Sequence, residues 1–160
     1  LKMIQMAEKR IYFQTPYFIP DQAILDSLKI AVKSGIDVRI MVPCKPDHPL
    51  VYWATYSYLG EMAQAGAKCY TYQNGFLHAK TMTVDGLVSC VGTANMDIRS
   101  FQLNFEVNAT IYSETTAKKL EEAFENDLMH CEEVTEETYE QRTLLIRMKE
   151  QVSRLFSPLL

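Results

Sequence analysis

Four polar side chains in the middle of the chain form a set that suits a phosphate ester. His78 and Lys80 lie two residues apart, and Thr93 and Asn95 follow at the same spacing. Lysine supplies positive charge, while threonine and asparagine supply neutral hydrogen-bonding groups. Histidine can act as a nucleophile or as an acid and base near neutral pH. The set predicts phosphoryl transfer through a phosphohistidine intermediate, and no metal is expected because no adjacent carboxylates could hold Mg²⁺.

A predicted hairpin brings these residues together. The Asp-Gly pair at positions 85–86 is typical of a two-residue turn, in which the numbers of opposed positions sum to 171. His78 is then expected to face Thr93, and Lys80 to face Val91. Since residues two apart share a strand face, the polar groups gather on one side. The alternative is an exposed hairpin with a solvated lysine and a satisfied histidine, and the hairpin geometry alone does not separate the two.

The same residues resemble a known motif. The phospholipase D superfamily carries the pattern HxKxxxxD…G(S/T)xN, and this chain has, in order and with fitting gaps, His78, Lys80, Asp85, Gly92, Thr93 and Asn95. Threonine stands where serine is commoner. Longer segments are similar to bacterial cardiolipin synthases, namely QTPYFIPD (14–21), GFLHAK (75–80), VGTANMDIRSFQLNFEVN (91–108) and RLFSPLL (154–160). The resemblance covers nearly the whole chain and corresponds to the C-terminal catalytic half of those enzymes.

The resemblance implies a role for each matching residue. His78 is a catalytic histidine, Lys80 and Asn95 bind the phosphate, and Thr93 assists them as a substrate-binding hydrogen-bond group. Glu106 lies on the strand expected after the motif, where the family places a carboxylate that orients the histidine through its other ring nitrogen.

Asp85 belongs to the catalytic motif by its position. We expect it to support the turn rather than to touch the substrate.

In this superfamily two such motifs meet at one active site. One histidine attacks the phosphodiester, and the other protonates the leaving alcohol and then activates the acceptor. This chain carries one motif, because neither His48 nor His130 has a lysine two residues later. The partner is therefore expected to be an N-terminal half outside this chain, or a second copy of the chain. The start at Leu1 favours a fragment, which we expect to have little or no activity alone.

The implied reaction is phosphatidyl transfer between two phosphatidylglycerol molecules, giving cardiolipin and glycerol. The resemblance implies a transferase of phospholipid biosynthesis without a cofactor, whose parent protein sits at the cell membrane with its catalytic domain on the cytoplasmic side. The fragment itself is expected to be soluble. Which half supplies the nucleophile, and which acceptor alcohol is used, stay open.

Composition fits an ordinary globular domain. The chain has 160 residues, 48 % of them hydrophobic, and a net charge of −4. That charge disfavours nucleic acid, which needs a basic groove. It is unevenly spread: residues 1–112 carry a net +1, residues 113–140 a net −8, and residues 141–160 a net +3. None of the four cysteines forms a C-x-x-C pair, so a zinc site is not expected.

Alternating strands and helices must position the site. Residues 10–15, 36–42 and 67–72 are predicted to be strands. They alternate with a helix that Asp21 caps and Gly35 ends, and with a helix over residues 50–65 that Gly66 ends. Further strands are expected at 78–84, 87–91 and 104–112, and helices at 115–129 and 139–156. The order predicts one α/β phospholipase D-like layered domain over residues 1–160, with a mixed β-sheet flanked by helices.

The last predicted helix is basic and amphipathic. It is expected either to pack on the body of the domain or to lie on anionic lipid.

Two other functions stay open at this stage. One is a related phosphodiesterase or nuclease with its site at a homodimer interface, and the other is a non-catalytic, membrane-peripheral or dimerising module.

Overall fold

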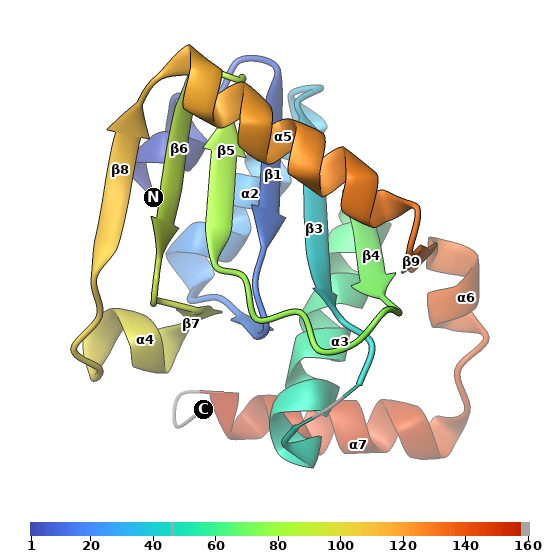
Figure 1. Ribbon diagram of the computed structural model, residues 1–160. Coiled ribbons are helices and arrows are strands. Elements are labelled where there is room, and N and C mark those ends of the chain that lie inside the picture. Colours follow the sequence, from blue (N-terminus) through green and yellow to red (C-terminus); the bar gives the residue numbers. More distant parts are fainter. Residues whose placement is uncertain (46, 158–160) are drawn as a thin grey trace.

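The computed structural model describes residues 1–45 and 47–157, and a mixed β-sheet forms its centre (Figure 1). The strands of this sheet are β1 (Arg10–Gln14), β3 (Asp37–Pro43), β4 (Lys68–Tyr72), β5 (Thr81–Val84), β6 (Val88–Gly92), β8 (Asn108–Tyr112) and β9 (Cys131–Glu133). Their order across the sheet is β8-β6-β5-β1-β3-β4-β9. Strands β1, β3 and β4 run parallel, and each of the other four is antiparallel to its neighbour. A separate pair of short parallel strands joins β2 (Phe18–Ile19) to β7 (Met96–Asp97).

Helices cover both faces of the sheet. They are α1 (Lys2–Gln5), α2 (Gln22–Lys33), α3 (Pro49–Ala65), α4 (Ile98–Gln102), α5 (Glu114–Leu128), α6 (Glu136–Glu140) and α7 (Leu144–Leu155). Helix α5 crosses one face, α2 and α3 lie behind the other, and α7 packs against α3 (Figure 1). The predicted mixed sheet flanked by helices is therefore confirmed.

Local sequence explains the helices that follow β1 and β3. The Asp21 carboxylate accepts a hydrogen bond from the Ile24 N–H at 2.8 Å and so caps α2. Helix α3 begins at Pro49 and ends at Gly66, whose φ of 108° is a left-handed value that glycine adopts without strain. Both helices bury apolar side chains against the sheet. The largest fully buried side chains include Phe13, Ile40, Leu28 and Leu59.

The turn between β5 and β6 corrects the predicted hairpin. The strands pair with Thr81 opposite Val91 and Val84 opposite Val88, so the loop holds three residues instead of two. Leu87 joins Asp85 and Gly86 in this loop, because it donates its N–H to the Val84 carbonyl at 3.0 Å and does not pair. The register is shifted by one residue, and Lys80 lies opposite Gly92 rather than Val91: the Gly92 N–H donates to the Lys80 carbonyl at 3.2 Å.

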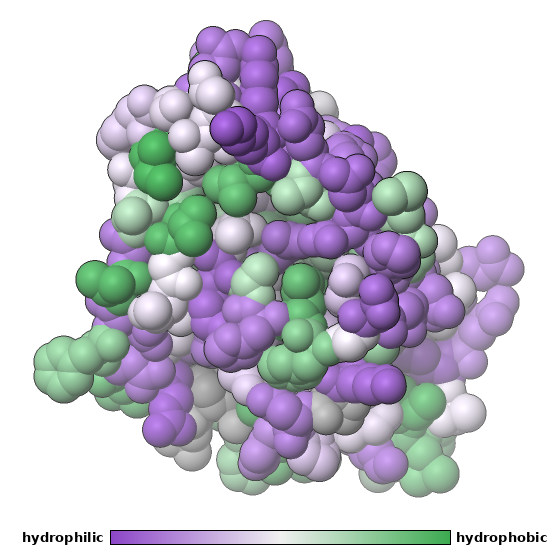
Figure 2. Space-filling view, viewed as in Figure 1, coloured by the Kyte–Doolittle hydropathy of each residue, from purple (hydrophilic) through white to green (hydrophobic). Residues whose placement is uncertain are grey.

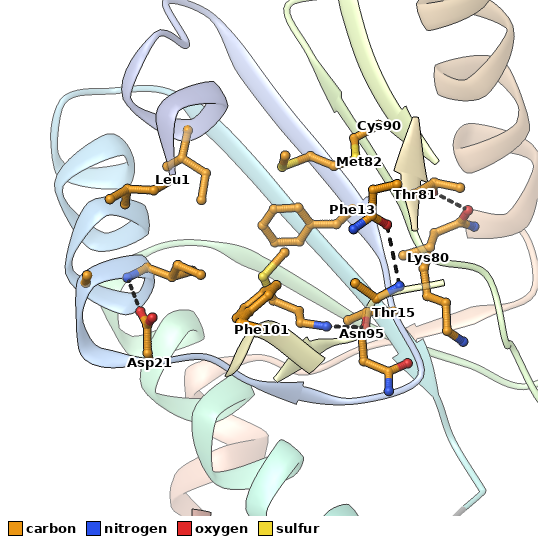
Figure 3. Close-up of a pocket in the computed structure, with 17 residues that line it drawn as sticks. Leu1, Phe13, Thr15, Asp21, Lys80, Thr81, Met82, Cys90, Asn95 and Phe101 are labelled. Atoms are coloured by element: carbon orange, nitrogen blue, oxygen red, sulfur yellow. Dashed lines mark hydrogen bonds between the residues drawn. The ribbon is translucent and has the colours of Figure 1, made fainter. Parts of the chain in front are cut away.

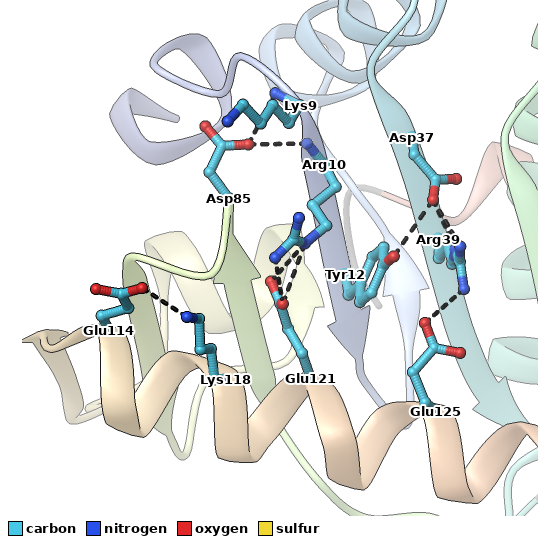
Figure 4. Close-up of polar contacts among 10 residues, drawn as sticks. All are labelled: Lys9, Arg10, Tyr12, Asp37, Arg39, Asp85, Glu114, Lys118, Glu121 and Glu125. Atoms are coloured by element: carbon cyan, nitrogen blue, oxygen red, sulfur yellow. Dashed lines mark hydrogen bonds and ion pairs between the residues drawn. The ribbon is translucent and has the colours of Figure 1, made fainter.

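Asp85 ties this turn to the start of β1. Its carboxylate accepts hydrogen bonds from the backbone N–H groups of Glu8, Lys9 and Arg10, each at 2.8 Å. Figure 4 shows Asp85 beside Lys9 and Arg10. Burial opposes ionisation of Asp85, but these hydrogen bonds outweigh burial and hold its pKa below the ordinary 3.8. Asp85 therefore fixes one end of β5 against β1.

Helix α5 is fastened to the same strand by an ion pair and a stacked ring pair. Arg10 Nη2 lies 2.7 Å from Glu121 Oε2, and Glu121 is largely buried. Next along β1, the Tyr12 ring stacks on Phe124 with centroids 5.1 Å apart. The Arg39 guanidinium covers the other side of Tyr12 at 4.5 Å and pairs with Glu125 of α5 (Figure 4). These contacts join α5 to the centre of the sheet.

Three other expectations need correction. The strand predicted at 78–84 begins only at Thr81, and the one predicted at 104–112 begins only at Asn108. The helix predicted over 139–156 is two helices, α6 and α7, because Thr143 leaves the helical path and caps α7 by accepting the Ile146 N–H. Within the described ranges, the helices are too short or too polar to cross a bilayer.

We predict that Asp85→Asn lowers the free energy of unfolding by about 1–2 kcal/mol, because a hydrogen bond to a charged group is worth about that much. Since the pKa of Asp85 is lower in the folded chain, its contribution is present above pH 3.8 and is lost as the pH falls through the folded pKa. Urea unfolding at several pH values measures both effects. A variant as stable as the wild type at neutral pH would contradict the anchoring role.

Candidate functional site

Two loops carry the candidate residues to the end of the sheet where β1 and β3 finish. His78 and Lys80 lie in the segment that joins β4 to β5, and Thr93 and Asn95 lie between β6 and β7. In Figure 1 this is the lower end of the molecule, near α4. The site is thus made by loops, while the paired strands behind them set where each loop begins.

His78 and Lys80 contact each other directly. Lys80 Nζ lies 3.1 Å from His78 Nε2 and donates to the His78 carbonyl at 3.0 Å. The imidazole also stacks on Phe76, with ring centroids 5.9 Å apart. A lysine ammonium can only donate, so in this arrangement Nε2 is the unprotonated nitrogen. Partial burial lowers the pKa of Lys80, and the negative charges of Glu106 and Asp97 counter this effect.

Thr93 is hydrogen-bonded to Glu106. Its hydroxyl donates to Glu106 Oε2 and accepts the Val107 N–H at 3.0 Å. Asn104 donates to the other carboxylate oxygen at 3.2 Å. The hydrogen bond from Thr93, despite some desolvation, lowers the pKa of Glu106. Thr93, Asn104 and Ser100 thus stabilise the Glu106 carboxylate, and Glu106 stands in the loop before β8 rather than on the strand.

Asn95 is positioned by its neighbours and keeps a free amide oxygen. Its backbone N–H donates to Ser100 Oγ at 3.2 Å, and Ser100 is in turn held by the Asp97 cap of α4. Within the described part of the chain, Asn95 Oδ1 is buried without a hydrogen-bond partner. A buried amide in this state is a group that a ligand can satisfy.

An apolar cavity of about 290 Å³ opens beside Lys80 and Asn95. Figure 3 shows Phe13, Met82, Cys90 and Phe101 around it, with the polar groups of Lys80, Asn95 and Thr15 on one side. A second hollow adjoins Asn95, and its lining includes His48, Asp97, Arg99 and Asn104. Asn95 thus lines both an apolar and a polar space.

The structure brings four of the six predicted site residues into one region. Of the other two, one lies beside this region and one lies at the opposite end of β5. His78, Lys80, Thr93 and Asn95 gather at one end of the sheet. Glu106 joins them through Thr93, without a hydrogen bond to His78. Asp85 lies at the opposite end of β5, where its carboxylate binds the backbone before β1.

Sequence reasoning missed the apolar lining of the cavity. Phe13 and Met82 face each other across paired strands β1 and β5, while Phe101 comes from α4. No local pattern links these residues. The signal that the sequence did contain is a large apolar residue, Phe101, soon after the motif, because such a side chain beside polar site residues often lines a ligand pocket.

Solved structures of phospholipase D relatives share this fold. The phospholipase D family member Nuc from Salmonella typhimurium superposes with a TM-score of 0.74, at 21 % identity, over 84 % of this chain and 87 % of that one. Phosphatidylserine synthase from Haemophilus influenzae superposes with a TM-score of 0.77, at 16 % identity, over 99 % of this chain and 43 % of that one. At these identities the likeness concerns the fold.

The sequence comparisons give the family. The family described as cardiolipin synthase, PLD-like domain, matches residues 1–128, and the chain belongs to it. The major cardiolipin synthase of Bacillus subtilis is 59 % identical over all of this chain, and cardiolipin synthase 1 of Staphylococcus aureus is 53 % identical over 99 % of it. The chain spans about a third of the length of each of these relatives, 33 % and 32 %.

We predict that Gly92→Ala disturbs the loop that carries Thr93. A Cβ at Gly92 would lie 2.7 Å from Asn108 Cα and would overlap Asn108 Oδ1 and the Val107 carbonyl, so β8 would have to move. We expect a loss of about 1–3 kcal/mol in unfolding free energy, measured with urea. Val91→Ala is the control: Val91 precedes Gly92 on β6 and is 36 % exposed, so its truncation adds no contact and should cost less. Equal effects would contradict the close-approach explanation.

Proposed function

We propose that the chain is one catalytic half of a cardiolipin synthase, which transfers a phosphatidyl group from one phosphatidylglycerol to another and releases glycerol. The observation that carries this proposal is that Lys80 and Asn95 line an apolar cavity while Lys80 contacts His78. Family membership supports the substrate class.

The reaction needs two histidines that take complementary roles. One attacks phosphorus, so that an N–P bond forms while the bond from phosphorus to the glycerol oxygen breaks. The other donates its proton to that oxygen. It then takes a proton from the hydroxyl of the second phosphatidylglycerol, which attacks phosphorus and frees the first histidine. We assign His78 to one of these roles. Both steps use proton transfer by imidazole and require no metal or cofactor.

The contacts of His78 suit the attack on phosphorus and the later, proton-accepting step of the other role. Nε2 holds the lone pair, as the donation from Lys80 requires, and can attack phosphorus or accept a proton. Once a phosphate enters, its oxygens are stronger acceptors for the Lys80 ammonium than a neutral imidazole is, so we expect Lys80 to turn to the phosphate. The amide nitrogen of Asn95 can donate to the same phosphate, while its free Oδ1 can accept from a hydroxyl group.

The apolar cavity favours a lipid over a soluble diester. Phe13, Met82 and Phe101 offer no hydrogen bonds, and they suit the hydrocarbon next to a phosphate. A nuclease would need a basic groove for the nucleic acid backbone, while this chain carries a net charge of −4. A nuclease with its site at a homodimer interface is thus the less favoured alternative.

Exposed apolar residues beside Thr93 and Glu106 support an incomplete site. Leu103, Phe105 and Val107 all point to solvent in the loop before β8. Figure 2 shows hydrophobic side chains over this edge of the molecule. We propose that the half carrying the other motif covers this surface and adds the second histidine. Residues 1–160 then form one domain of a larger protein that works at the cell membrane.

We predict that His78→Ala in the full-length protein lowers phosphatidyl transfer by about 1000-fold or more, because no other group at this position can replace the imidazole. Conversion of phosphatidylglycerol to cardiolipin measures it. His130→Ala is the matched control, since His130 lies in the turn after α5 with its ring against Tyr72, and it should retain activity. Undiminished transfer in His78→Ala would exclude the assigned role.

We predict that the purified 160-residue chain converts little or no phosphatidylglycerol, because it supplies one of the two histidines. The full-length protein in the same assay is the positive control. Light scattering on the same sample reports whether the chain is monomeric. Robust turnover by a monomer would overturn the two-half arrangement, and turnover only by a dimer would favour the second copy as partner.

A further inference from the structure

Helix α7 turns its polar side toward the protein. Glu150 is 1 % exposed and pairs with Arg142, whose Nη1 lies 2.9 Å from Glu150 Oε2. Ser153 is buried as well, and Arg154 pairs with Glu61 of α3. The helix is attached to α3 by the Arg154–Glu61 ion pair and by the cations of Lys149 and Arg154 over the rings of Trp53 and Tyr58. This is the reverse of the usual arrangement, in which an amphipathic helix buries its apolar stripe.

The apolar side of α7 consequently faces solvent. Its members are 53–80 % exposed, and they are Leu144, Leu145, Met148, Val152 and Leu155. At helical spacing these positions share one stripe. In Figure 2 hydrophobic side chains appear along the lower edge of the molecule, where α7 runs in Figure 1. A continuous apolar stripe of this kind marks a surface that another phase or molecule covers.

The charges beside the stripe indicate what covers it. Glu150 is the only acidic residue of α7, and it is buried against Arg142. Arg147 and Lys149 are exposed on opposite flanks of the stripe, where Arg147 donates to the Glu140 carbonyl and Lys149 Nζ lies 5.2 Å from the centroid of the Trp53 ring. The solvent side of α7 is thus apolar with positive borders. The apolar surface beside the site differs, because its residues enclose the acidic Glu106.

We infer that α7 is an interfacial helix that lies on a bilayer containing anionic lipid. The apolar stripe would enter the boundary of the acyl chains, while Arg147 and Lys149 keep their long side chains at the level of the phosphates. The buried pair of Glu150 and Arg142 holds this side outward, because turning the helix over would place an unpaired carboxylate in lipid.

The position of α7 relates the proposed bilayer contact to the candidate site. The helix runs along the same end of the molecule as the loops that carry His78 and Asn95 (Figure 1). A bilayer against α7 would therefore lie at this end of the molecule. This inference extends the proposed function by naming the surface that meets the lipid, and it does not need His78.

Vesicle binding by the 160-residue chain tests the inference. We expect sedimentation with vesicles of phosphatidylcholine mixed with phosphatidylglycerol, and much weaker sedimentation with phosphatidylcholine alone. The triple variant Leu145→Gln, Met148→Gln, Val152→Gln should bind the mixed vesicles at least about 10-fold more weakly, because three apolar contacts are removed. Circular dichroism confirms that the variants fold.

Two controls keep the outcomes separate. The matched triple Ile30→Gln, Leu87→Gln, Met129→Gln changes residues of similar exposure, 55–75 %, on other elements, and should bind like the wild type. Lys119→Gln removes an exposed cation of α5 and should also bind. Binding that is lost in Lys119→Gln but kept in the α7 triple would overturn the inference, as would binding equal to both kinds of vesicle. Loss of activity in a His78 variant leaves this test unaffected.

Discussion

The register between β1 and β5 is the constraint on which the candidate site depends. Asp85 fixes one end of β5 by accepting three N–H groups that precede or begin β1. At the other end Thr81 donates to Gln14 Oε1 at 3.2 Å, and Gln14 donates to Asp127 of α5 at 2.6 Å. Because side chains alternate along a strand, a slip of one residue would turn every side chain of β5 to the other face. Lys80, next to Thr81, would then leave the cavity.

Much of the fold follows from local pattern, and the exceptions have physical causes. The alternation of apolar strands with capped helices predicted β1, α2, β3, α3 and β4 to within a residue or two. The prediction of a two-residue turn was wrong. Asp85 accepts a hydrogen bond from Arg10, which is 75 residues away in sequence, and a local pattern does not reveal this contact. Strand β9 was missed because Cys131–Glu133 is polar and pairs only at the sheet edge.

Some features of the candidate site follow from the motif, and others depend on how separate elements pack. The spacing of His78, Lys80 and Asn95 predicted that they gather, and they do. The hydrogen-bond partners of Glu106 did not follow from the sequence, because Thr93 binds one of its carboxylate oxygens and Asn104 binds the other. The apolar cavity was also unforeseen, since its walls come from separate strands and from α4. For α7 the pattern predicted amphipathicity, but the Arg142–Glu150 pair decides which side is buried.

The acidic helix and the basic helix lie at opposite ends of the molecule. Helix α5 carries five acidic and two basic residues at the upper end in Figure 1, and α7 carries three basic residues and one acidic residue at the lower end. The chain is therefore an electric dipole despite its modest net charge. Within about 10 Å of a negatively charged surface, the electric field of that surface exerts a torque that turns the α7 end of the molecule toward the surface. Added salt shortens that range, so the rate of productive encounter should fall as ionic strength rises, before any contact is made.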